Sequence, residues 1–195
     1  MQIFRLLGFS SVVVYRGYFY QQKMINVSRN LLIPASIVQR MIARMAHEVV
    51  ERNRGTENLL LVGIVPRGLV VAHRFATAIH EITGVRPEVR ALEVNPYRYQ
   101  PLSARIEPLP FLPPTEGKDI LLVDDVLFSG LTIRAALEAI KPNGRPSSVQ
   151  LAILIDRGHR KWPLQPDYCG RYIPTKHQEQ ILVDEAEDLA VFLQE

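Results

Sequence analysis

The stretch ILLVDDVLFSGLTIRAALEAI, from Ile120 to Ile140, determines the fold that we expect for this chain. An apolar run of strand length is followed by two adjacent carboxylates, a small polar turn and an alanine-rich helix. We expect Ile120–Val123 to lie in a buried strand, so that Asp124 and Asp125 emerge at its carboxyl end. In α/β sheets ligands bind at that edge. Two negative charges in this place therefore indicate a bound ligand.

The turn after the two acids is suited to a phosphate group. Residues 128–132 are expected to connect the strand to the helix, and Gly130 gives the turn conformational freedom. The backbone amides of Ser129–Thr132 would then point out of a helix amino terminus, which is an arrangement that binds anions. The carboxylates could accept hydrogen bonds from vicinal hydroxyls, and a hydrated magnesium ion would offset their charge. A sugar phosphate meets both requirements; the alternative is that the two acids only cap the turn and the helix.

Strands and helices alternate along the rest of the chain. Apolar residues recur at three-to-four spacing in residues 34–53, which predicts an amphipathic helix, and a second helical pattern covers residues 69–84. Apolar runs or alternating patterns predict strands at residues 58–65, 88–94 and 149–155. This alternation predicts an α/β protein in which a mostly parallel sheet is flanked by helices.

Two segments do not fit the alternation. Residues 95–118 contain six prolines, which exclude a helix and predict a lid, an extra hairpin or disorder. Residues 1–26 carry an apolar stretch that Arg16 interrupts; it is too short for a membrane span and lacks a clear cleavage site for a signal peptide. We expect a non-core extension there, with Met24 as a candidate true start, and one domain from residue 27 to residue 195.

The composition fits a single globular domain. The chain has 195 residues, of which 47% are hydrophobic and 22% charged, so its core needs neither metal nor disulfides. Cys169 has no second cysteine to pair with, which favours a reducing cytoplasm. A net charge of +3 does not demand nucleic acid, although it allows a basic patch or an anionic small ligand.

Several blocks of the sequence resemble one protein family. ILLVDDVLFSGLT is similar to the phosphoribosyl-pyrophosphate (PRPP) signature of type I phosphoribosyltransferases. RMAHEVVERNRG, LLLVGIVPRG and GRPSSVQLAILIDRGHRKWPLQPDYCGRYIPT extend the resemblance to the PyrR proteins, which are bacterial regulators of the pyrimidine operon and also uracil phosphoribosyltransferases. The resemblance covers about residues 33–183. It implies a type I phosphoribosyltransferase fold with a flexible lid, a hood to which residues 156–180 contribute, and formation of UMP and diphosphate from uracil and PRPP.

The resemblance also implies roles for individual residues. Asp124 and Asp125 would hold the ribose hydroxyls, and with Arg98 they are the expected catalytic residues. Arg67 and Gly68 match the family's pyrophosphate loop, although Arg67 could instead be a solvated surface residue. The rest of the PRPP site would comprise Val126, Leu127, Phe128, Ser129, Gly130, Leu131 and Thr132. The uracil site would comprise Arg157, His159, Trp162, Pro163 and Leu164. Mg²⁺ would bind chiefly through PRPP, without direct protein ligands.

The lid departs from the family pattern. The stretch NPYRYQPL keeps Tyr97 and Arg98 but has Tyr99 and Gln100 where the family has two acids. Arg98 could still clamp the pyrophosphate in a closed state. Two alternatives therefore stay open: a catalytically weak regulator that senses uridine nucleotides and binds RNA, and a phosphoribosyltransferase for another base.

A second role follows from the resemblance, because some PyrR proteins bind a messenger-RNA hairpin through a basic face of the dimer. The matching residues are Arg44, His47, Arg52, His159 and Arg171. The charge pattern alone is equally typical of a solvated helix face. The resemblance further implies a homodimer or a higher homo-oligomer without a membrane partner.

Overall fold

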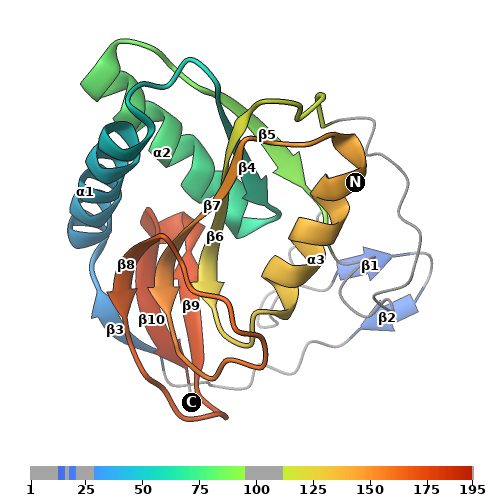
Figure 1. Ribbon diagram of the computed structural model, residues 1–195. Coiled ribbons are helices and arrows are strands. Elements are labelled where there is room, and N and C mark those ends of the chain that lie inside the picture. Colours follow the sequence, from blue (N-terminus) through green and yellow to red (C-terminus); the bar gives the residue numbers. More distant parts are fainter. Residues whose placement is uncertain (1–12, 16–17, 21–28, 95–111, 195) are drawn as a thin grey trace.

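A five-stranded parallel sheet forms the centre of the molecule in the computed structural model, which describes residues 13–15, 18–20, 29–94 and 112–194 (Figure 1). The strand order is β5-β4-β6-β7-β8. The strands are β4 (Leu59–Ile64), β5 (Glu88–Leu92), β6 (Asp119–Leu127), β7 (Ser148–Asp156) and β8 (Tyr168–Tyr172). The predicted α/β class with a mostly parallel sheet is confirmed.

Helices cover both faces of this sheet. Figure 1 shows α1 (Ala35–Asn53) and α2 (Arg67–Thr83) on one side and α3 (Leu131–Ile140) on the other, with a short 3₁₀ turn at Lys141–Asn143 after α3. Because successive side chains of a strand point to opposite faces, Leu59 and Leu61 pack toward α1 and α2, whereas Leu60 and Val62 pack toward α3. All six residues of β4 are buried, which explains its unbroken apolar sequence.

The predicted helices are confirmed with small changes at their ends. Helix α1 begins at Ala35, one residue after the predicted start, and ends at Asn53 as predicted. Helix α2 ends at Thr83, and its C-cap Gly84 has a φ of 76°, in the left-handed region. However, α2 begins at Arg67, two residues before the predicted start. Among the described residues, none of the helices combines the length and the hydropathy that a membrane span requires.

The prediction for the end of the central strand is wrong. We expected the strand to end at Val123, but β6 continues to Leu127, so Asp124 and Asp125 lie within it. The reason is the pairing partner, because β7 continues alongside β6 as far as the pair Leu127 and Asp156. Asp124 therefore pairs with Ile153, and Asp125 lies between paired residues of the strand.

Three groups of strands have no counterpart in the sequence prediction. The first is β8, which lies in the segment expected to contribute to the hood but pairs parallel to β7 in the central sheet. An antiparallel sheet consists of β3 (Arg29–Ile33), β10 (Ala190–Gln194) and β9 (Gln180–Asp184), in that order. Its apolar residues Val183 and Val191 are fully buried in the core beside α1 and α2. The strands β1 (Val13–Tyr15) and β2 (Tyr18–Tyr20) form an antiparallel pair. Most of the predicted lid, including Arg98, lies outside the described residues.

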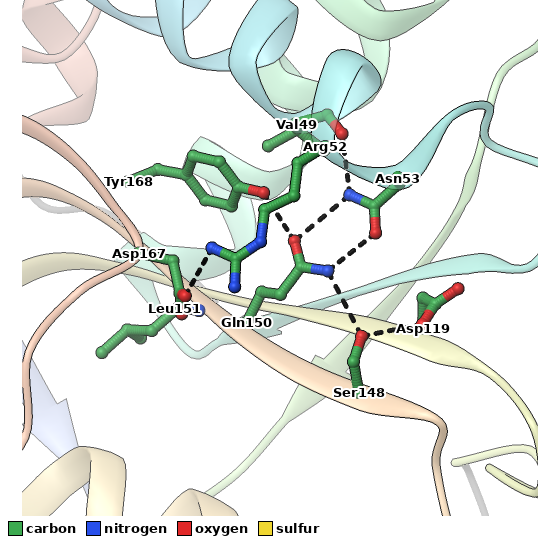
Figure 2. A network of polar contacts seen from close by, with 9 residues as sticks. All are labelled: Val49, Arg52, Asn53, Asp119, Ser148, Gln150, Leu151, Asp167 and Tyr168. Carbon is green, nitrogen blue, oxygen red and sulfur yellow. Dashed lines mark hydrogen bonds and ion pairs between the residues drawn. The ribbon is translucent and has the colours of Figure 1, made fainter.

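A buried polar network joins α1 to the amino ends of the strands (Figure 2). The Gln150 carboxamide accepts a hydrogen bond from the Tyr168 hydroxyl at 2.6 Å and donates to Asn53 Oδ1 at 2.7 Å and to Ser148 Oγ at 3.2 Å. Ser148 Oγ in turn donates to Asp119 at 2.7 Å. Burial raises the pKa of Tyr168, which keeps its hydroxyl protonated as a donor.

Replacing Gln150 by leucine is expected to lower the free energy of unfolding by about 2–4 kcal/mol, because the buried Tyr168 hydroxyl and the Asn53 amide would lose their partner. Urea unfolding monitored by circular dichroism measures this loss. Tyr168→Phe is the matched control, since it removes one hydrogen bond and is expected to cost only about 1 kcal/mol. Equal losses in the two variants would contradict a network centred on Gln150.

Candidate functional site

The site begins where β6 extends past its neighbour β4. Pairing between the two strands stops at Gly63 and Val123, whereas β6 remains paired with β7 on its other edge. The edge of β6 beyond Val123 therefore faces the connection between β4 and α2. A pocket of about 190 Å³ lies there and is lined by Ile64, Val65, Pro66, Arg67, Val94, Asp124, Asp125, Val126 and Thr132.

The two carboxylates of β6 are buried at this pocket. Asp124 is 7% exposed, and the side chain of Asp125 is 14% exposed. Asp124 Oδ1 accepts a hydrogen bond from the Asp125 amide at 3.0 Å, and Asp125 Oδ1 accepts one from the Val126 amide at 2.9 Å. Burial raises the pKa of Asp125, while the Arg67 guanidinium, 3.9 Å from Asp125 Oδ2, opposes this rise. The site thus holds acceptors that a polar ligand can use.

The start of α2 forms the opposite wall of the pocket. The Val65–Pro66 peptide is cis, and α2 begins at the next residue, Arg67, whose side chain is 42% exposed. Arg67 is therefore not a freely solvated arginine, since its guanidinium faces Asp125. Gly68 is buried so closely against β6 that a Cβ atom there would lie 2.5 Å from the Val123 carbonyl oxygen. This contact brings the positive end of the α2 dipole next to the acids.

The predicted phosphate loop has the expected conformation. Gly130 has a φ of 84° and immediately precedes α3, whose Arg134 amide donates to the Gly130 carbonyl at 2.9 Å. In the described structure no side chain caps this helix, and the Leu131 amide makes only a long contact of 3.4 Å with Ser129 Oγ. The amino terminus of α3 is therefore available to an anion. Thr132, in the first turn of this helix, also lines the pocket.

The residues predicted to contact a base lie around the phosphate loop. Trp162 and Leu164 lie against Gly130, at 3.3 and 3.4 Å from the position of a Cβ atom there. The Arg157 guanidinium is buried, donates to Thr175 Oγ1 at 2.8 Å and stands 4.4 Å from the centre of the Phe128 ring. Burial lowers the pKa of Arg157.

His159 also lies beside the phosphate loop. Its ring centre is 5.3 Å from that of Phe128 and 4.5 Å from that of His177. Pro163, between Trp162 and Leu164, is exposed. A direct contact between a base and any of these residues stays a prediction. The sequence prediction missed Arg160, which bonds the Phe128 carbonyl; its spacing of four from the oppositely charged Asp156 could have indicated it.

The predicted RNA-binding residues lie on adjacent elements, since α1 packs against β8. Arg44 donates to the carbonyls of Cys169 and Gly170 and pairs with Glu48. Arg52 pairs with Asp167 at 2.7 Å, which raises its pKa. His47 and Arg171 are exposed nearby on these two elements, whereas His159 lies beside the phosphate loop.

The sequence matches a known protein family whose activity suits this site. A family model described as a phosphoribosyl transferase domain matches residues 34–182. The fold and the site therefore define a phosphoribosyltransferase, and the predicted enzyme class is confirmed.

Relatives of known identity show to which family of phosphoribosyltransferases the chain belongs. A bifunctional protein PyrR from Geobacter sp. (strain M21) is 46% identical over 158 residues, which cover 78% of this chain and 89% of the relative. A protein of the same name from Halalkalibacterium halodurans is 42% identical over 158 residues, with coverage of 78% and 88%. The chain belongs to the PyrR family, as the sequence motifs predicted.

Solved structures show the same fold at low sequence identity. The hypoxanthine phosphoribosyltransferase of Trypanosoma cruzi matches with a TM-score of 0.67 and 17% identity, covering 84% of this chain and 95% of that one. A hypoxanthine phosphoribosyltransferase from Staphylococcus aureus matches with a TM-score of 0.60 and 19% identity, covering 80% and 85%. These similarities concern the fold alone.

Proposed function

We propose that this chain transfers the phosphoribosyl group of PRPP to uracil and thereby forms UMP and diphosphate. The observation that carries the proposal is the pocket at the end of β6, which Asp124, Asp125, Arg67 and Thr132 line and in which Asp125 faces Arg67. Membership in the PyrR family supports uracil as the base.

Each part of the pocket matches one part of the substrate. Asp124 and Asp125 would accept hydrogen bonds from the ribose hydroxyls. The amides at the start of α3 would bind the 5-phosphate, and those at the start of α2, together with Arg67, would bind the pyrophosphate. The reaction passes through an oxocarbenium-like state, so the site must neutralise the leaving group and orient the attacking nitrogen.

The residues fit Mg²⁺ that arrives with PRPP. Among the described residues no group of three or more His, Cys, Asp or Glu side chains could hold a metal ion, and the pocket offers only two carboxylates. Mg²⁺ generally keeps several waters and binds through one or two carboxylates plus substrate phosphates. When bound, it would supply charge neutralisation for the departing pyrophosphate.

Turnover with uracil and hypoxanthine, each with PRPP and Mg²⁺, tests the proposed function. We expect UMP formation at a kcat/KM at least about 100-fold above that for hypoxanthine, because buried polar groups matched to one base reject another. Faster reaction with hypoxanthine would establish a purine enzyme. If neither base reacts while UMP still binds, the chain is a nucleotide-sensing regulator, which the altered lid at Tyr99 and Gln100 would suit.

We further propose a regulatory role through messenger RNA, with the homodimer as the binding unit in the cytoplasm. The packing of α1 against β8 supports this role, because it gathers Arg44, His47 and Arg171 on neighbouring elements. Binding to a hairpin from a pyrimidine-operon leader should weaken steeply with salt. His47→Ala and Arg171→Ala are each expected to weaken it several-fold while UMP formation is unchanged; unchanged RNA affinity in both would exclude this face.

A further inference from the structure

We propose that Arg160 is a positioning residue that fixes the orientation of the phosphate-loop peptides, so that their amides face the 5-phosphate. This inference rests on the proposed function of that loop. It assigns to the segment 157–164 a role in phosphate binding in addition to the predicted contact with the base.

The side chain of Arg160 binds several backbone carbonyls at once. Its Nη1 atom donates to the carbonyls of Phe128 and Gly158, both at 3.0 Å, and its Nε atom donates to the Leu164 carbonyl at 2.9 Å. Its Nη2 atom pairs with the Asp156 carboxylate, whose other oxygen accepts from the Gly158 amide at 2.8 Å. The arginine side chain is 21% exposed and that of Asp156 is 12% exposed. Four of the five N–H donors of the guanidinium are therefore used inside the protein.

Backbone bonds continue the same pattern along the loop. The Arg157 amide donates to the Leu127 carbonyl at 2.9 Å, and the Lys161 amide donates to the Ser129 carbonyl at 3.0 Å. Three consecutive carbonyls, those of Leu127, Phe128 and Ser129, thus point toward the segment 157–161. In a trans peptide the N–H group points opposite to the carbonyl of the same unit. The amides of Ser129 and Gly130 must then point away from this segment.

We infer that the 5-phosphate lies on that opposite side, next to the pocket that Thr132 and both acids line. Of the described residues that line it, none belongs to the segment 157–164, whereas Thr132 and both acids do line it. Trp162 and Leu164 lie against Gly130 from the side of the segment. Successive amides on one side of a turn form a concave anion site, and a carbonyl turned into that site would repel the phosphate. Among the described residues, the carbonyls of Leu127 and Ser129 accept from backbone amides, whereas that of Phe128 accepts from the Arg160 side chain, so a substitution of Arg160 can release the Phe128 carbonyl.

Arg160→Met tests this role, because methionine keeps much of the length and apolar stem but none of the donors. We expect the Kd for UMP and for ribose 5-phosphate to rise about 10- to 100-fold, as for the loss of a charge-assisted hydrogen-bond set. The Kd for uridine, which lacks the phosphate, should change less than about two-fold. Isothermal titration calorimetry measures all three ligands. In turnover assays, KM for PRPP should rise much more than KM for uracil.

Two further variants make the result decisive. Arg160→Lys keeps the charge, but its single nitrogen cannot replace the three separate nitrogens of the guanidinium. It should therefore give an intermediate rise in the Kd for UMP, and it serves if Arg160→Met does not fold. Arg145→Met is the matched control, because Arg145 is an exposed arginine between the 3₁₀ turn after α3 and β7. It should leave all three Kd values unchanged.

The outcomes separate this inference from the proposed function. Equal weakening of UMP and uridine would show a general structural role and overturn the inference, as would unchanged UMP affinity in both Arg160 variants. If the wild type fails to react with uracil but loses ribose 5-phosphate affinity on Arg160→Met, the proposed function fails and the inference stands. A wild type that binds neither UMP nor ribose 5-phosphate would overturn both.

Discussion

Asp125→Asn is expected to lower kcat/KM for UMP formation by about 100- to 1,000-fold, the range for loss of one preorganised electrostatic contact to a transition state. The reason is the position of Asp125 within β6, where its carboxylate faces the pocket and Arg67. Asparagine has nearly the same shape but no charge to stabilise the positive ribose of the transition state. Steady-state kinetics at saturating Mg²⁺ measure the change. Asp119→Asn is the control on the same strand, because Asp119 lies at its far end and accepts from Ser148.

Asp125→Asn should raise the stability of the protein at neutral pH, although it lowers activity. The pKa of Asp125 is raised by burial, so the folded state holds the proton more tightly than the unfolded state does. Stability therefore falls as the pH rises from the unfolded to the folded pKa, and the cost is fully present above both. We expect Asp125→Asn to melt at a higher temperature than the wild type at pH 7, with a difference that shrinks on acidification below the unfolded pKa. An equal or lower melting temperature at pH 7 would contradict a net cost of burying this charge.

Gly68→Ala should abolish most activity by a steric route. The new Cβ would lie 2.5 Å from the Val123 carbonyl oxygen and 3.0 Å from the Asp124 Cα atom, both of which belong to the backbone of β6. Because neither atom can rotate away, the start of α2 has to move off the sheet. We expect a fall in kcat/KM of about 100-fold, since a displacement near 1 Å can have this effect, and a loss of about 1–3 kcal/mol in the free energy of unfolding.

Gly84→Ala provides the control for the stability component of this result. Gly84 lies at the other end of α2 with a φ of 76°, and nothing lies within 4 Å of its Cβ position. The substitution should cost about 1 kcal/mol through backbone strain and leave turnover intact. Comparable activities of the two variants would contradict the idea that Gly68 is required for close approach of α2 to β6.

Four of the five strands of the central sheet and its helices could be predicted because their signals are local, whereas β8 was not predicted. An unbroken apolar run such as β4 and the three-to-four spacing of α1 each determine an element within a few residues. The antiparallel sheet of β3, β10 and β9 could not be predicted in this way. It pairs residues near 30 with residues near 190, and such long-range pairing leaves no periodic signal in either segment alone.

The site was predictable to a similar degree. Asp124, Asp125 and the phosphate loop were predicted from the sequence motif and Gly68 from the family resemblance, and their roles stay predictions. The place of the acids inside β6 depends on how far β7 continues alongside. Likewise, the bond from Arg160 to Phe128 spans 32 residues, and its geometry depends on how the turn after β7 folds back. The packing of Trp162 onto Gly130 also depends on how this turn folds back, so it could not be predicted from the sequence.

The continuation of β6 to Leu127 has a consequence for the thermodynamics of binding. Since the ladder with β7 pairs Asp124 and the residue after Asp125, the backbone around both acids is already ordered, and the chain does not have to lose conformational entropy there when a ribose is bound. The sugar should then bind to a preformed site. The heat-capacity change of binding should be little larger than the part that comes from the surface buried by the ligand. Any large ordering of the protein on binding has to come from other parts of the chain.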